Sequence, residues 1–407
     1  MKLLYVTVSL PFGEAETFTI PEIETLLSRG HEVKIVPVAP SRGPLHHASV
    51  AALLPCAVKA PVIDAAMVGA AVSSLVTHPR QALRILRTLL RSRTPKIALK
   101  NLAVYPKGAW LARLATQWQA DHIHAHWASV PATVAMIASE LSGIPFSFTA
   151  HRWDIAENNL LADKTAQARF VRFIADDGLS TARAMGIAGL DRKATVIHMG
   201  VKLPSGATDK PIANDVAVLL CPAFLHPRKG HTYLLQAMRT LIDDGVACRL
   251  IVAGDGPSTA MLADEVNQLG LEGHVTFRGY VAHADLLQMY QREEVDIVVL
   301  PSLHEGIPVA LMEAMAHGIP VVATRVGGVP ELLSSGGGVM VAPADASALA
   351  GAIGALLRNP DDARAMGAVG RRSVLAGFSS DAVCARLEAH FIGPVGGPAL
   401  AVSKDAA

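Results

Sequence analysis

The sequence has little charge and few cysteines for its length. Charged residues make up 17% of its 407 residues and hydrophobic residues 51%, which excludes intrinsic disorder over most of the chain. Lys and Arg total 36 against 35 Asp and Glu, and the resulting net charge of +1 argues against a general nucleic-acid-binding protein. The four cysteines lie far apart, with no CxxC pair and no disulfide-dense pattern, which favours a reducing compartment.

Long hydrophobic runs are missing as well. The most apolar segment, Ala65–Val76, is about 12 residues long and is too short to cross a bilayer. Met1–Val8 is apolar, but it lacks a cleavage-site pattern, so we expect no signal peptide. Together with the cysteine usage, this predicts a cytoplasmic protein.

Alternating apolar runs and helical patterns predict an α/β fold. A chain of this length exceeds one core and suggests two domains of about 150–200 residues. The first begins with a βαβ unit: a strand at Lys2–Val8, a helix at Thr17–Ser28 and a strand at Val33–Val38. Further strands are predicted at His122–His126, Phe146–Thr149 and Thr195–His198, and in the second half at Val216–Leu220, Arg249–Val252, Val275–Phe277, Asp296–Leu300, Pro320–Ala323 and Val339–Val341.

Both halves are therefore predicted to be Rossmann-like, doubly wound domains. The polar segment Leu203–Asp215 is the best linker, so we place the first domain at 1–203 and the second at 216–376. We expect a helix at 377–392 that packs back toward the first domain, and a flexible tail at 393–407. A ligand is expected between the domains, at the carboxyl ends of both sheets.

The most informative motif lies in Leu300–Leu333. A predicted strand ends at Leu300, a loop carries Glu305, and a helix begins near Pro308, a residue suited to a first helical position. The free backbone N–H groups of that helix can hold a diphosphate, and the Glu305 and Glu313 carboxylates can address two ends of an elongated ligand. The alternative is structural: Glu305 caps the helix and Glu313 is a solvated helix residue.

These residues resemble a known enzyme family. The spacing E-x7-E in EGIPVALMEAMAHGIPVVAT, followed by GGVPELL, is similar to the retaining glycosyltransferase family 4, which has the GT-B fold. AGDGP, VTFRGYV, PRKGHTYLLQAM, HMGV and TAHRWDI support the resemblance in the expected order. The opening PFGEAETFTIPEIETLLSRGHEV resembles the branch that builds bacterial exopolysaccharides, such as the colanic-acid transferases.

The resemblance implies a hexosyltransferase. Such an enzyme moves a sugar from a nucleotide-diphosphate donor to a glycan or lipid-linked acceptor with retained anomeric configuration, and needs no metal or other cofactor. Two alternatives stay open: a nucleotide-sugar epimerase or sugar phosphorylase of the same fold, and a non-catalytic nucleotide-sugar-binding partner.

Site residues follow from the same resemblance. Glu313 would bind the ribose, Glu305 the transferred sugar, and Lys229 the leaving diphosphate, while His151 would contact the donor sugar near the reaction centre. The backbone of Gly306, Ile307, Pro308 and Val309 would meet the sugar and diphosphate. Gly254 and Gly256 are interpreted as a tight turn near the base, with a plain structural turn as the alternative.

One position departs from the family pattern. Many members carry a Gly-Arg pair shortly before Lys229, whereas Ala223 and Phe224 stand here. Arg228 is the candidate replacement for the missing arginine.

The acceptor side is predicted in the first domain. Gly13, Glu16 and Thr17 lie in the loop after the first strand, and His126 ends a later strand. His122, His124 and His126 alternate along that strand and could share a face, which leaves a zinc site as a minor alternative. We favour a polar strand end without a metal, because no acidic or cysteine partner has ligand spacing.

Charge is unevenly distributed along the first domain. Between Val33 and Ala120 the only acidic residue is Asp64, whereas the same span holds twelve basic residues. Within Pro79–Leu90, arginines recur every three to four residues with leucines between them, which predicts a basic amphipathic helix. We therefore predict peripheral binding to the anionic cytoplasmic face of the inner membrane. The alternative is a solvated helix paired with acids from elsewhere in the fold.

Overall fold

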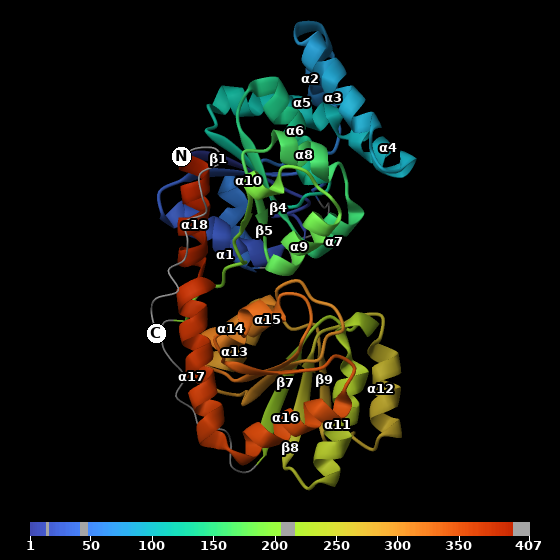
Figure 1. Ribbon diagram of the computed structural model, residues 1–407, viewed down its shortest axis with the longest axis vertical. Helices are drawn as coiled ribbons and strands as arrows, with labels where there is room; N and C mark the ends of the chain where they lie inside the picture. The colour runs from blue at the N-terminus through green and yellow to red at the C-terminus, as the bar shows by residue number, and fades with distance from the viewer. Residues whose placement is uncertain (14–15, 41–47, 205–215, 394–407) are drawn as a thin grey trace. The chain divides into compact units, whose positions relative to one another are not determined.

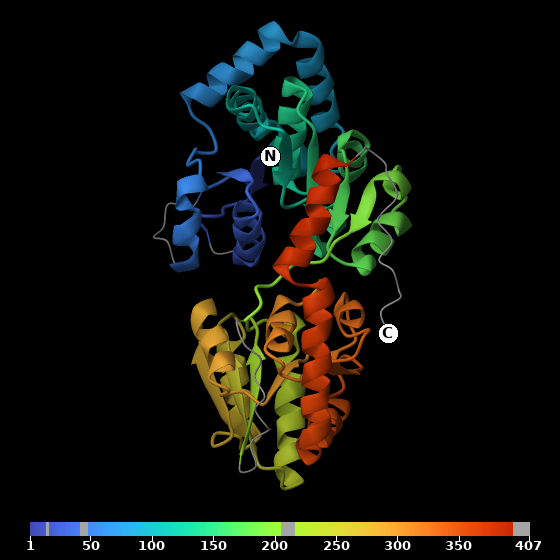
Figure 2. The same ribbon diagram turned by 90° about the vertical axis from the view of Figure 1, so that its left-hand side faces the viewer.

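The computed structural model describes residues 1–13, 16–40, 48–204 and 216–393 (Figures 1 and 2). The chain divides into two compact units, Met199–Ala382 (unit 2) and Met1–His198 with Val383–Ala407 (unit 1). Most of the predicted linker and all but the first residue of the predicted tail lie outside the described residues.

Unit 1 is built on a six-stranded parallel sheet in the order β2-β1-β3-β4-β5-β6. The strands are β1 (Lys2–Thr7), β2 (Glu32–Pro37), β3 (His122–Ala125), β4 (Phe146–Ala150), β5 (Val171–Phe173) and β6 (Ala194–Val196). The sequence pattern missed β5, because Arg172 interrupts its short apolar run. That arginine is fully buried, and its guanidinium donates to the carboxylate of Glu22 at 2.6 Å.

Helices cover both faces of this sheet. They are α1 (Ile20–Ser28), α2 (Ala65–Thr77), α3 (Pro79–Leu90), α4 (Pro95–Ala103), α5 (Tyr105–Trp118), α6 (Val130–Ser142), α7 (Arg152–Glu157), α8 (Leu161–Gln167), α9 (Asp176–Ala184), α10 (Leu190–Lys193) and α18 (Ser380–Ile392), with 3-10 helices at Thr17–Thr19 and Ala48–Cys56. One core lies between the sheet and α5 and α6, and a second joins α1 to Leu387 and Phe391 of α18. Helices α2, α3 and α4 form an outer layer against α5 and α6 (Figure 1).

Unit 2 repeats the plan with the order β12-β11-β10-β7-β8-β9. Its parallel strands are β7 (Ala217–Pro222), β8 (Cys248–Ala253), β9 (Val275–Gly279), β10 (Ile297–Leu300), β11 (Val321–Thr324) and β12 (Gly338–Val341). Its helices are α11 (His231–Asp243), α12 (Thr259–Gln268), α13 (His283–Gln291), α14 (Val309–Ala316), α15 (Val329–Leu332), α16 (Ala346–Arg358) and α17 (Pro360–Gly377), with a 3-10 turn at Pro227–Lys229.

The predicted fold class, with two doubly wound Rossmann-like domains, is confirmed. Each sheet has one switch point, where the strand order reverses: between β1 and β3 in unit 1, and between β7 and β10 in unit 2. Ligands of open parallel sheets bind beyond the carboxyl ends of the strands at such points. Among the described helices, none combines the length and apolar character needed to cross a bilayer.

Candidate functional site

The switch point of unit 2 brings a cation and a carboxylate together. Lys229 lies in the loop after β7, and Glu305 lies in the loop after the neighbouring strand β10. The Lys229 Nζ is 2.5 Å from Glu305 Oε1, and the Ser302 hydroxyl donates to the same oxygen at 2.6 Å. The side chains of Lys229 and Glu305 keep 19% and 10% exposure, so a ligand in solution can still reach this pair.

Backbone contacts hold these two loops against each other. The Leu303 N–H donates to the Arg228 carbonyl at 2.8 Å. Gly230 has φ +67°, and a Cβ there would lie 2.1 Å from the Pro301 carbonyl oxygen. Only glycine allows this approach, so the sequence Lys229-Gly230 sets how closely the lysine loop can pack on the Glu305 loop.

Helix α14 carries the second predicted carboxylate. Pro308 is extended and immediately precedes the helix, which begins at Val309. Glu313 is buried one turn further on, and its Oε1 is 2.6 Å from His283 Nε2. This hydrogen bond raises the pKa of His283. Glu313 is therefore not a solvated helix residue, as the structural alternative supposed. Its carboxylate is buried and is held by His283, a side chain of α13.

Glycines shape the remaining loops of this end of unit 2. A Cβ on Gly254 would lie 2.0 Å from the Ala223 carbonyl oxygen, and one on Gly256 would lie 2.3 Å from that of Leu225. Gly254 and Gly256 therefore let the loop after β8 pass close to the loop after β7. The Phe224 ring is 53% exposed and stacks beside His226, at the position where many family members have arginine.

The predicted donor residues thus lie on the neighbouring loops after β7, β8 and β10 and on helix α14. Gly306 accepts a hydrogen bond from the Gly328 N–H at 2.6 Å, and a Cβ on Gly327 would lie 2.1 Å from the Glu305 carbonyl oxygen. The loop after β11 is therefore packed directly on the segment Glu305–Val309. Within the loop after β7, the Arg228 N–H donates to His226 Nδ1 at 3.2 Å.

In unit 1, a buried carboxylate organises the loop after β1. The carboxylate of Glu16 accepts hydrogen bonds from the backbone N–H groups of Val8, Ser9 and Leu10 at 2.8–3.0 Å, and from Trp127 Nε1 at 2.8 Å. Glu16 is fully buried, so it would affect an acceptor through the loop that it holds. Gly13 packs against Ser9 in this loop, and Thr17 begins the following 3-10 turn.

Two histidines meet at the same end of the unit 1 sheet. His151 Nε2 is 3.1 Å from His126 Nε2, and the Trp127 indole stacks on His151 at 4.2 Å between ring centroids. Burial lowers the pKa of His151 to about 3 and that of His126 well below its ordinary value. Both imidazoles are therefore neutral at physiological pH, and one of them donates its N–H to the other.

The comparisons with known proteins agree with this layout. Residues 208–373 match the family described as Glycosyl transferases group 1. The chain is 30% identical, over 86% of its length and 89% of the relative's, to the putative colanic acid biosynthesis glycosyltransferase WcaL of Salmonella typhimurium. This chain belongs to the group 1 glycosyltransferases. The predicted resemblance to the family-4 type, and to the colanic-acid transferases in particular, is confirmed.

Solved structures agree on the fold of this glycosyltransferase. Anabaena HepE in complex with UDP matches with a TM-score of 0.72 and 19% identity, over 95% of this chain and 98% of that one. The lipopolysaccharide outer core galactosyltransferase WaaB matches with a TM-score of 0.67 and 17% identity, over 96% and 99%. These likenesses place the chain in the GT-B fold.

Two residues that hold predicted site residues, one in each unit, had no role in the sequence prediction. His283 holds Glu313, and Asp154 holds His151: its carboxylate accepts the His151 backbone N–H at 2.7 Å and that of Ala128 at 2.6 Å. Burial raises the pKa of Asp154 to about 7. A His-Arg-Trp-Asp order just after a strand, with the aspartate three residues after the capping residue His151, is the helix-capping signal that could have found Asp154.

The structure also supplies an acidic partner that the sequence did not indicate for the strand histidines. Ligand atoms of Glu22, His124 and His126 lie within 4.8 Å of one another. However, the Arg172 guanidinium lies 2.6 Å from Glu22, and His124 bonds the hydroxyls of Ser147 and Thr149. A metal ion there would compete with a buried cation and displace these bonds, so the arrangement fits a hydrogen-bonded core better than a metal centre. The absence of a metal requirement stays a prediction.

Proposed function

We propose that this glycosyltransferase transfers a hexosyl group from a nucleotide-diphosphate donor to a glycan or lipid-linked acceptor. The transfer retains the anomeric configuration and serves exopolysaccharide or cell-envelope polysaccharide biosynthesis. The observation that carries the proposal is the similarity to WcaL along nearly the whole chain. The HepE structures with UDP and with UDP-glucose support a nucleotide-sugar donor.

On the donor side, Lys229 meets the diphosphate. Negative charge builds on the leaving diphosphate as the glycosidic bond breaks, and a cation already in place stabilises that charge. In this structure the cation is paired with Glu305. Donor binding would draw the Lys229 ammonium toward phosphate and release the Glu305 carboxylate for the sugar hydroxyls, while Glu313 binds the ribose. No metal is required in this scheme, and Arg228 supplies a second cation.

On the acceptor side, His151 and His126 offer neutral imidazoles. A neutral imidazole can donate or accept a hydrogen bond without placing a second charge beside the developing oxocarbenium ion. The loop that contains Gly13 and Thr17, held by Glu16, would border the acceptor. The leaving phosphate assists attack on the same face of the sugar, since no side chain stands out as a covalent nucleophile.

We place this reaction at the cytoplasmic face of the inner membrane, with the enzyme peripherally bound. The concentration of basic residues between Val33 and Ala120 supports this location. A lipid-linked acceptor would then be presented to unit 1 while unit 2 holds the soluble donor.

A donor screen followed by product analysis tests the proposed function. UDP-glucose, UDP-galactose and GDP-mannose are compared by thermal shift, and the stabilising donor is incubated with lipid-linked or glycan acceptors. We expect a glycosylated product whose anomeric proton coupling, measured by NMR, matches that of the donor. An inverted anomer refutes retention. A changed sugar without acceptor indicates an epimerase, phosphate-dependent cleavage indicates a phosphorylase, and donor binding without turnover on any acceptor indicates a non-catalytic partner.

A further inference from the structure

The outer helices of unit 1 expose a large share of the apolar side chains. In the described part of the chain, eighteen large hydrophobic residues are exposed, and half of them fall between positions 62 and 99. These nine are Val62, Ile63, Val68, Val72, Leu75, Val76, Leu83, Leu90 and Leu99. Single exposed apolar residues need no explanation, but this concentration on three consecutive helices and the segment just before them does.

Helix α2 presents a solvent-facing apolar stripe. Val68, Val72, Leu75 and Val76 recur at helical spacing, and Val76 is 75% exposed. The opposite side of the helix, which includes Met67, is buried against the domain. The stripe is therefore additional to the face that packs in the core, and folding of unit 1 leaves it uncovered.

Helix α3 continues the surface with charge beside apolar groups. Leu83 and Leu90 are exposed two turns apart, next to the row of arginines on the same helix. Arg84 pairs with Glu140 at 2.6 Å and Arg91 lies 3.9 Å from Asp163, so acids of α6 and α8 take part of the charge, as the solvated-helix alternative predicted.

The rest of the charge is left without acidic partners. Arg80 and Arg87 form no ion pair among the described residues, and α4 with its preceding turn adds Arg93, Lys96 and Lys100. The sequence has no Asp or Glu from 65 to 120. The surface therefore combines exposed apolar groups with an excess of positive charge.

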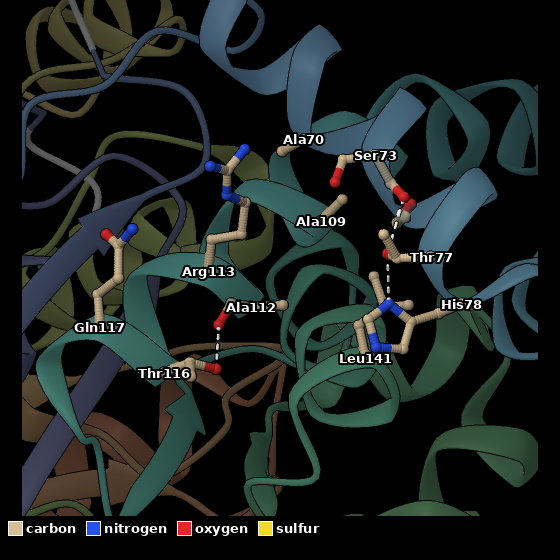
Figure 3. Close-up of a pocket in the computed structure, with 11 residues that line it drawn as sticks. Ala70, Ser73, Thr77, His78, Ala109, Ala112, Arg113, Thr116, Gln117 and Leu141 are labelled. Atoms are coloured by element: carbon tan, nitrogen blue, oxygen red, sulfur yellow. Dashed lines mark hydrogen bonds between the residues drawn. The ribbon is translucent and has the colours of Figure 1, made fainter.

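A cavity with several polar side chains at its wall adjoins the stripe. Ser73 and Thr77, each one position after a stripe valine, line a cavity of about 320 Å³ between α2 and α5, together with His78 and Arg113 (Figure 3). Hydroxyls and a cation are the groups that bind phosphate oxygens. The surface thus resembles an amphipathic helix that lies in a membrane interface, with apolar side chains on one part and cations and hydrogen-bond donors beside them.

We infer that helices α2, α3 and α4 form a surface that docks on an anionic lipid bilayer. The valines and leucines enter the boundary between headgroups and acyl chains, and the unpaired arginines and lysines meet the lipid phosphates. The inference deepens the membrane location of the proposed function, on which it rests, by naming the surface that meets the bilayer where a lipid-linked acceptor would lie. Binding itself is independent of sugar transfer.

Vesicle sedimentation of the full chain tests this surface. The probes are vesicles of phosphatidylcholine alone and with about 30 mol% phosphatidylglycerol, at low and high salt. We expect binding to the anionic vesicles that weakens with salt. Replacing Arg80 and Arg87 by glutamine should lower the partition coefficient about 30-fold, since each basic residue near the surface contributes about 1 kcal/mol. Arg80 and Arg87 are chosen because replacing them leaves the ion pairs of Arg84 with Glu140 and of Arg91 with Asp163 intact.

Two further variants make the result decisive. Val72→Ser with Val76→Ser should weaken binding at least about 10-fold at both salt concentrations, because it removes exposed apolar area. The matched control, Arg358→Gln with Arg372→Gln on unit 2, changes net charge equally and should leave binding unchanged. Equal wild-type binding to neutral and anionic vesicles, no binding to either, or an equal loss in the control overturns the inference. Donor binding and transfer to a water-soluble acceptor are measured on the wild type and the same variants. If the wild type neither binds a donor nor transfers sugar, the proposed sugar transfer is wrong, whereas failure of vesicle binding contradicts docking and the proposed membrane location alone.

Discussion

Replacing Lys229 with methionine should weaken the binding of a nucleoside diphosphate and reveal the competition between Glu305 and phosphate for this lysine. The Lys229 ammonium lies 2.5 Å from the Glu305 carboxylate, and both side chains are largely buried. At an effective dielectric constant of about 20, this separation corresponds to a gross attraction of about 6–7 kcal/mol. Desolvation of the two groups offsets most of that energy.

The net value of one charge-assisted hydrogen bond is about 1.5–3 kcal/mol. The diphosphate must draw Lys229 away from Glu305, so the measured affinity contains the difference between two such bonds. Lys229→Met removes the bond to phosphate and also the pair with Glu305 that it replaces, so binding should weaken by at most about 150-fold, the value of one such bond without competition. Glu305→Gln removes the competing charge and should leave diphosphate affinity unchanged or tighter, while turnover with the intact donor falls.

Isothermal titration with the free nucleoside diphosphate measures the first effect, and steady-state kinetics with the nucleotide sugar measures the second. The double variant reports how strongly the two side chains are coupled. Arg364→Gln, which removes an exposed ion pair with Asp361 on helix α17, is a control for charge in the same unit. Unchanged affinity in Lys229→Met, or weakened diphosphate binding together with normal turnover in Glu305→Gln, would refute the proposed roles.

Four other outcomes are expected. Glu313→Ala should weaken donor binding by about 1–3 kcal/mol, measured by titration, because a ribose hydrogen bond is lost; equal affinity contradicts that role. His151→Ala should lower turnover more than donor affinity. Because burial lowers the pKa of His151 to about 3, protonation of this imidazole should cause no inflection in the wild-type rate between pH 5 and 8. Glu388→Gln should lower the free energy of unfolding by about 1–2 kcal/mol near neutral pH, because Arg29 donates two hydrogen bonds to Glu388 and lowers its pKa. This stabilisation is complete above the ordinary carboxyl pKa and is lost as the pH falls through the lowered pKa of Glu388 in the folded protein. The urea-unfolding curves of variant and wild type should therefore converge in acid. A chelator should leave transferase activity intact, and loss of activity that a divalent ion restores contradicts the metal-free scheme.

The local pattern of the sequence predicted most of the strands and helices. Buried parallel strands require near-continuous apolar runs, and these are visible without any knowledge of their neighbours. Helix α3 begins and ends where the sequence predicted, at Pro79–Leu90. Strand β5 was missed for the opposite reason: Arg172 is tolerated in its interior only because Glu22, 150 residues away, neutralises it.

In the candidate site, too, residues close in sequence were predictable and their tertiary contacts were not. The motif around Glu305 and Glu313 was visible because its residues are close in sequence, and the family resemblance assigned their roles. The partners of those residues were not visible, since Lys229 reaches Glu305 only through the adjacency of β7 and β10. His283 reaches Glu313 from another helix in the same way.

The sequence by itself determined the two α/β domains, the spacing of the carboxylates and the concentration of positive charge in the first domain. Tertiary structure decided which of those charges are neutralised. Arg84 meets Glu140 across two helices, whereas Arg80, one turn earlier, meets no acid in the described part of the chain. The physical reason is range: secondary structure follows from neighbours within a few residues, whereas burial, ion pairing and pKa depend on groups that only the folded chain brings within a few ångströms.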